Sequence, residues 1–482
     1  MPAEAWFSVS ATPKGDIYVG GSDHRTNSAL YRLSARREKL EYIGDAKSAS
    51  EAAKNWLVGE TAQKIHVRPL YFRCRLYFAT ADFTAEREGY LGHRGFHWYA
   101  YDLAQRRLLD LSASEPGGVG GAHASIIATA IDWEEGLIYA LDTPRCLLFR
   151  YDIAKGRTEN LGRSPFIPEG YFFPGRYIWI GRGGRVYFTA SACSHVLYYD
   201  PQSGYGERKD WPIGDVGRSP KGFRTGTKSL DQQRVYTVDG AGRIYLYDSR
   251  DDRFQLLGQA TSDRTEYQCK GFLKIRCFNV TPDEKEIYFI NDDAERSAFW
   301  EWDVATSTTK KLCDLAALDG QIGEPAFNAH AGNDSWGGDG CIYFCSFGSD
   351  EEHPTPLVLS RVDPVKVKVQ VGLLPEETDV DVTVLKSSGV ELRRSGKTVQ
   401  GLKVILKVQA GIDADAAASY PRFTIPSGSD RVAVDLNELS PQRIPSHVEL
   451  VLTVVGDGDT YVAGINKRVT MTPGTGGQAG AD

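Results

Sequence analysis

The sequence predicts an all-β protein, a seven-bladed β-propeller followed by a small β-sandwich. Fifty glycines, 24 tyrosines and 20 phenylalanines beside two methionines favour many short strands joined by tight turns. A tyrosine-centred repeat runs through the chain as far as about residue 372. Beyond that point valine-rich alternation takes over, which is typical of antiparallel strands.

The repeat unit is an aliphatic or β-branched residue followed by tyrosine, close to a glycine or acidic turn. Its seven copies centre on Tyr18, Tyr77, Tyr139, Tyr187, Tyr236, Tyr288 and Tyr343, with spacings of 59, 62, 48, 49, 52 and 55 residues. Such spacings suit one four-stranded unit with variable loops. A second strand follows and usually ends in an aromatic residue and Asp, as in YAYD at 99–102. Closing seven units into a ring removes long exposed sheet edges, which favours a propeller over an open solenoid.

The predicted domains are the propeller at 1–372, a β-sandwich at 373–470 and a flexible tail at 471–482. The sandwich rests on alternating segments such as DVDVTVLKSS and HVELVLTVV. Its few aromatic residues favour packing or assembly over sugar recognition. The final TPGTGGQAGAD is glycine-rich and without hydrophobic periodicity, so we expect it to fray.

Composition and motifs disfavour several classes of function. A net charge of −7 and a pI near 5.8 argue against nucleic-acid binding. No apolar run approaches the roughly 20 residues that span a bilayer, and no signal peptide stands at the start. We therefore expect a cytoplasmic location without membrane contact, or a secreted or periplasmic one if the sequence is a trimmed mature form. No nucleophile-elbow, zinc-helix, phosphate-loop or dinucleotide motif occurs in its required context.

Candidate site residues are expected on the first strand of each blade, which lines the central channel. Counting 11 residues back from the repeat tyrosine reaches His66 in blade two and Arg176 in blade four, so these two are predicted to be equivalent. His123 and His330 lie upstream of the tyrosines of blades three and seven, and His97 precedes the second strand of blade two. These side chains are expected to converge on one opening.

Basic residues before blades five and six favour an anionic ligand. SPKGFRTGTK carries Arg224 and Lys228, and CKGFLKIRC carries further lysines. They would make the opening basic although the whole chain is acidic. Structural roles remain open beside this interpretation: a hydrogen-bonded histidine at His66 and an ion pair between blades at Arg176.

Several segments resemble the seven-bladed propeller polysaccharide lyases, with ulvan and rhamnose-glucuronate lyases nearest. They are KIHV followed by LYFAT, GFHWYAYD, GLIYALDTPRCLLFRYD and PGRYIWIGRGGRVYFT, and the similarity covers roughly the first 370 residues. The resemblance implies β-elimination on a uronate-containing glycan by histidines, a tyrosine and an arginine. The matching positions are His66, His97, Tyr139 and Arg176.

The chemistry requires those residue types. A uronate C5 proton is weakly acidic, so the adjacent carboxylate must be neutralised by a guanidinium, a protonated imidazole or a metal. His and Tyr suit the base that takes the proton and the acid that protonates the departing oxygen. A divalent metal, Zn or Ca, could be held by His66, His123 and His330 across the channel.

Two alternatives remain. In the first, a non-catalytic propeller binds a carbohydrate or protein through its histidines, arginines and Trp336. The second is a lactonase-like or antibiotic-lyase propeller with a metal, or a single His and Glu, in the channel. Few carboxylates fall on the first strands, which counts against a calcium-type site.

Overall fold

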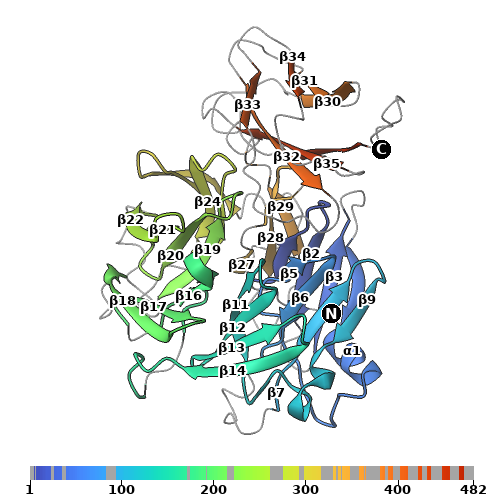
Figure 1. The fold of residues 1–482 in the computed structure, drawn as a ribbon, viewed down its shortest axis with the longest axis vertical. Helices are drawn as coiled ribbons and strands as arrows, with labels where there is room; N and C mark the ends of the chain where they lie inside the picture. The colour runs from blue at the N-terminus through green and yellow to red at the C-terminus, as the bar shows by residue number, and fades with distance from the viewer. Residues whose placement is uncertain are drawn as a thin grey trace.

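Figure 1 shows a computed structural model of the chain. It describes residues 5, 7–22, 27–34, 40–82, 94–170, 174–190, 193–213, 222–260, 275–291, 298–315, 329–332, 335–337, 339–347, 358–362 and 364, and beyond these the seven strands β30 to β36.

Six four-stranded antiparallel sheets follow one another along the chain as blades. The first is β1 (Val9–Ala11), β2 (Ile17–Ser22), β3 (Ser28–Leu33) and β4 (Leu40–Asp45). The second is β5 (Leu70–Phe72), β6 (Arg75–Ala79), β8 (Trp98–Asp102) and β9 (Arg107–Asp110). The third is β11 (Ile126–Asp132), β12 (Leu137–Asp142), β13 (Leu147–Asp152) and β14 (Arg157–Arg163). The fourth is β15 (Trp179–Ile180), β16 (Val186–Phe188), β17 (His195–Asp200) and β18 (Gly204–Pro212). The fifth is β19 (Phe223–Lys228), β20 (Arg234–Asp239), β21 (Arg243–Asp248) and β22 (Arg253–Gln259). The sixth is β23 (Ile275–Val280), β24 (Glu286–Asn291), β25 (Ala298–Asp303) and β26 (Thr308–Asp314).

The seventh repeat departs from the prediction. Around Tyr343 the described strands β27 (Ala329–Ala331), β28 (Ile342–Phe347) and β29 (Val358–Val362) pair in that order as a three-stranded sheet. The β-propeller is confirmed, but among the residues that the structure describes the prediction of seven four-stranded blades is corrected to six. The three-stranded sheet lies between the sixth blade and the first.

Hydrophobic clusters join each sheet to the next and close the ring. One cluster joins the first three blades, and others join blades three and four, four and five, and five and six. Ile342 and Phe344 of β28 pack with blade six, while Cys341, Tyr343 and Cys345 pack with blade one. The two ends of the propeller are therefore held together by apolar contacts across the three-stranded sheet.

The repeat tyrosines have one structural role. All seven lie on the second strand of their sheet and are between 0% and 7% exposed. The aspartate that ends the third strand orders the following turn, as where Asp102 accepts hydrogen bonds from the backbone N–H groups of Ala104 and Gln105. Asp102 also accepts a hydrogen bond from Arg75, two residues before Tyr77, at 3.0 Å.

A few elements lie outside the blades. Helix α1 (Ala46–Ala52) follows blade one and begins at Asp45, whose side chain accepts a hydrogen bond from the Ser48 N–H. Strand β7 (Gly95–Phe96) pairs with β10 (Gly121–Ala122). Short 3₁₀ turns are η2 (Ser112–Ser114), η3 (Pro116–Gly118) and η4 (Arg182–Gly184).

The C-terminal strands form two antiparallel sheets, β30-β31-β34 and β33-β32-β35-β36. Their bounds are β30 (Val380–Leu385), β31 (Gly389–Arg394), β32 (Leu402–Ala410), β33 (Arg422–Ile425), β34 (Arg431–Asp435), β35 (Val448–Val455) and β36 (Asn466–Met471). The sandwich at 373–470 stays a prediction, and the tail at 471–482 lies, apart from Met471, outside the described residues.

Candidate functional site

His66 lies on the inner side of blade two, just before its first strand. The segment that carries it is held by an isolated bridge between Lys64 and Ala81, with N–H···O distances of 3.0 and 2.8 Å. The segment packs closely on β2 because Gly20 has no side chain: a Cβ there would lie 2.7 Å from Ile65. The His66 ring is 2% exposed, and its centroid lies 5.5 Å from that of Phe7.

Arg176 occupies the equivalent place in blade four, as the spacing predicts. It follows an isolated bridge between Pro174 and Ala190 by two residues, as His66 follows the Lys64 bridge. Its backbone N–H donates to the carbonyl oxygen of Phe223 at 2.8 Å. Arg176 is thereby fixed beside the first strand of blade five.

Two further arginines lie on neighbouring first strands at β-bulges. Arg224 is skipped in the pairing of β19 with β20, where Phe223 faces Asp239 and Thr225 faces Val238. Arg276 begins the register shift between β23 and β24, and β19 lies against β23. Bulges turn a side chain away from the regular alternation. Arg224 and Arg276 are 8% and 5% exposed.

We define a cationic cluster as Lys64, His66, Arg176, Arg224 and Arg276, of which all but the partly exposed Arg176 are buried. Burial first, and then the positive charges of Arg176, Lys64, Arg276 and Arg224, lower the pKa of His66 well below its usual range. Burial and the charges of Arg176 and Arg276 likewise lower the pKa of Arg224. At neutral pH the imidazole is therefore uncharged among cations from four blades.

His97 lies in a different setting, between two carboxylates. Its Nδ1 lies 3.0 Å from Oδ2 of Asp110, and its Nε2 lies 2.9 Å from Oε1 of Glu60. The His97 side chain is 2% exposed. Both ring nitrogens are engaged, so the predicted exchange of a proton with a ligand does not fit this arrangement.

Tyr139 lies on β12 in the core between blades three and four, with no exposed surface. Its ring packs on Tyr199, and burial raises its pKa although the positive charge of nearby Arg150 opposes this. Tyr139 has the same place as the other repeat tyrosines. The structure does not bring it into the cationic cluster.

The other predicted ligand contacts are dispersed. His123 follows β10, its N–H donates to the Arg94 carbonyl oxygen, and its own carbonyl accepts from Arg145. Trp336 donates a hydrogen bond to the Val280 carbonyl oxygen at 2.9 Å, and its ring packs on Tyr288. It therefore contributes to packing against the sixth blade. Lys228 ends β19 half-buried. His330 lies on β27, and its side chain is outside the described residues.

The predicted metal ligands do not form a described centre. Within the part of the chain that the structure describes, no three His, Cys, Asp or Glu side chains form a group that could hold a metal ion. The side chain of His330, the third predicted ligand, is not among the described ones. Zinc or calcium at His66, His123 and His330 stays a prediction.

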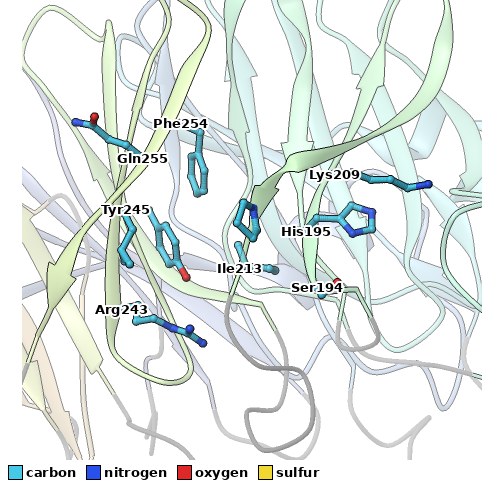
Figure 2. Close-up of a pocket in the computed structure, with 10 residues that line it drawn as sticks. Ser194, His195, Lys209, Ile213, Arg243, Tyr245, Phe254 and Gln255 are labelled. Carbon is cyan, nitrogen blue, oxygen red and sulfur yellow. The ribbon is translucent and has the colours of Figure 1, made fainter.

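A surface pocket of about 630 Å³ lies between blades four and five (Figure 2). Arg243 and Tyr245 lie on one side of it, and His195 and Lys209 on the other. Its basic groups have partners: His195 and Lys209 both contact Glu207, at 2.9 and 2.6 Å, and Arg243 contacts Asp239 at 3.0 Å. The basic groups of this pocket are therefore engaged by carboxylates of the protein itself.

Comparisons with known proteins find only distant structural similarities. No family model matches the chain, and no curated protein matches it. A solved streptogramin B lyase is 11% identical at a TM-score of 0.47 and covers 71% of this chain and 91% of its own. Virginiamycin B lyase from Staphylococcus aureus is 10% identical at 0.45, covering 71% and 92%. The β-propeller domain of Myceliophteria thermophila Cps50 (Swd1) is 10% identical at 0.47, covering 75% and 99%.

Similarities this low say nothing about activity. None of these three structures is a uronate polysaccharide lyase, so they lend no support to that resemblance. In the described residues, no helix is long and apolar enough to cross a bilayer.

Sequence reasoning missed Arg276 and the partners of His97. Arg276 stands 12 residues before Tyr288, as Arg224 does before Tyr236, so the shared offset could have identified it. Glu60 and Asp110 carried no comparable signal, because they belong to no repeated pattern.

Proposed function

We propose that the central channel binds a uronate-containing glycan and cleaves it by β-elimination, with His66 as the base. The observation that supports this most strongly is an uncharged, buried imidazole among cationic side chains from four blades. A base must be unprotonated to act, and a substrate carboxylate must be neutralised before the adjacent proton becomes acidic enough to leave.

The binding step follows from charge. Arg176, Arg224 and Arg276 present guanidinium groups, which suit a carboxylate because they donate in pairs. A bound carboxylate would offset their positive charge and so raise the basicity of His66 when substrate is present. Binding of the substrate would therefore make His66 a stronger base.

The elimination then balances as follows. His66 takes the C5 proton, the C5–H electron pair becomes the C4=C5 double bond, and the C4–O bond breaks. The departing oxygen takes a proton from water, and His66 afterwards returns its proton to the hydroxide. Water fills the role of the acid because His97 is held between carboxylates and Tyr139 lies in the core between blades. No step requires a metal.

A non-catalytic propeller that binds an acidic carbohydrate or a protein is the second candidate. Burial counts against elimination at His66, since His66, Arg224 and Arg276 are at most 8% exposed. A ligand would have to reach groups that neighbouring side chains already cover.

Ultraviolet absorbance distinguishes the two candidates, because only elimination creates a double bond conjugated with the carboxylate. The wild-type protein, His66→Gln and the control His195→Gln are incubated with a panel of uronate polysaccharides. A rise in absorbance with the wild type and the control, but not with His66→Gln, supports the lyase. Binding without a rise on any substrate would overturn it in favour of the binding propeller.

A further inference from the structure

The buried ions around His97 suggest a role for that residue other than chemistry. Glu60 accepts from His97 and also from Arg94, whose Nη1 lies 2.9 Å from Oε2. Asp110 accepts from His97, and from Ser50 and Asn55 at 2.7 and 2.9 Å. The His97 ring also stacks on Tyr99, with centroids 5.9 Å apart.

The geometry fixes the protonation of this ring. A neutral imidazole has one N–H, so one of the two carboxylates would face a lone pair. With both nitrogens within 3.0 Å of carboxylate oxygens, His97 donates from both and is a cation. Burial alone would lower the pKa of His97, but its hydrogen bonds to Asp110 and Glu60 outweigh burial and raise it.

Glu60 links the contacts of His97 to the segment that carries His66. It directly precedes the segment 61–66, which contains Lys64 and His66 and forms no regular strand. The segment is held by contacts of Thr61 with Asp82 and of Ser22 with the Gln63 carbonyl oxygen, and by the Lys64 bridge. A second tie runs through the backbone, since Thr80, beside the bridge partner Ala81, is hydrogen-bonded to His97.

We propose that His97 is a positioning residue, which through Glu60 holds the segment 61–66 so that His66 stays in the cationic cluster. The inference rests on the proposed function only in treating His66 as the acting base. A neutral His97 keeps one N–H, so either Glu60 or Asp110 then faces a ring lone pair, and loss of the donor to Glu60 loosens the segment. The site is therefore expected to lose order at alkaline pH, with Arg94 still holding Glu60.

Hydrogen exchange tests the proposal without any substrate, so its failure is distinct from failure of the proposed elimination. Wild type, His97→Gln, Glu60→Gln and the control His195→Gln are compared by mass spectrometry. His195 is the matched control because it also pairs with one glutamate, at 2.9 Å, but on blade four. Exchange over 61–67 is expected to be faster by about tenfold or more in His97→Gln, and unchanged in the control.

The rate of hydrogen exchange over 61–67 in the wild type is also expected to rise as the pH passes the raised pKa of His97. This rate is first corrected for the intrinsic pH dependence of amide exchange. His97→Gln should show no such step, a difference that mere packing would not produce. Glu60→Gln keeps the His97–Asp110 contact and removes the negative charge that pairs with His97 and Arg94, so it serves if His97→Gln does not fold. Equal exchange over 61–67 in the wild type and in a folded variant would overturn the proposal.

Discussion

Arg176 and His66 occupy equivalent positions in two blades, and after burial the charge of Arg176 is the largest cause of the lowered pKa of His66. The repeat therefore places two different side chains at equivalent positions of blades two and four, one a cation and the other an imidazole that burial first, and then this cation, keeps neutral. This pairing of a carboxylate-binding group with an uncharged base is the reason we favour elimination over simple binding.

His66→Gln is expected to abolish elimination while the protein stays folded. Glutamine is close in volume to histidine and cannot act as a base, so the rate should fall about 100-fold to 10,000-fold. Steady-state rates and thermal unfolding of the same preparation check this. A normal turnover rate in the folded variant would remove His66 from the mechanism.

Arg224→Met is expected to weaken the binding of an anionic oligosaccharide by about tenfold to a hundredfold, the value of a hydrogen bond to a charged group. Titration calorimetry measures it, with Arg250→Met as the control. Arg250 lies on the same blade but contacts Asp248 at the surface, where its side chain is 48% exposed. Equal affinities for the two variants would show that Arg224 does not contact the ligand.

The contribution of His97 to stability is expected to depend on pH. Its folded pKa is raised above the ordinary 6.5. The contribution is therefore fully present below 6.5 and is lost as the pH rises through the raised value. Burial alone would raise the pKa of Glu60, but its contacts, first of all with His97, outweigh burial and lower it. Glu60 therefore remains charged in mildly acidic solution.

Denaturant titrations of the wild type and His97→Gln at several pH values test this dependence. The difference in unfolding free energy should be about 3 kcal/mol near pH 6, because a buried ion pair loses one partner. It should shrink as the solution becomes alkaline. A difference that stays constant with pH would show that His97 is uncharged in the folded protein.

Asp252 is expected to be a strong anchor between blades four and five. It accepts hydrogen bonds from Tyr187 at 2.8 Å, from Tyr247 at 3.1 Å and from Arg208 at 2.9 Å. Asp252→Ala leaves these donors without that acceptor, so unfolding free energy should fall by about 3 kcal/mol. The exposed neighbour Asp251→Ala is the control, and equal denaturation midpoints would refute the prediction.

The repeat made much of the fold predictable. Each tyrosine lies on a second strand because a buried residue recurs there once per sheet, and this phasing also placed His66 and Arg176 correctly relative to each other. The three-stranded sheet was not foreseen, since the repeat at Tyr343 carries the same local pattern as the others.

The rest of the site depends on features that periodicity does not record. Bulges set the directions of Arg224 and Arg276, and a bulge leaves no regular signal in a strand. The partners of His97 stand 37 and 13 residues away and meet it only in the folded chain. The sequence predicts His97 near the channel opening, whereas in the structure it is a buried cation between two carboxylates.

The carboxylate requirement is the central claim, and one comparison tests it most directly. Calorimetry of the wild-type protein is carried out with a uronate oligosaccharide and with the same oligosaccharide after its carboxylates are reduced to alcohols. The cationic cluster predicts binding of the first and loss of at least about tenfold in affinity for the second. Equal binding of the two would contradict the account, because the arginines of the cationic cluster would then not bind the carboxylate.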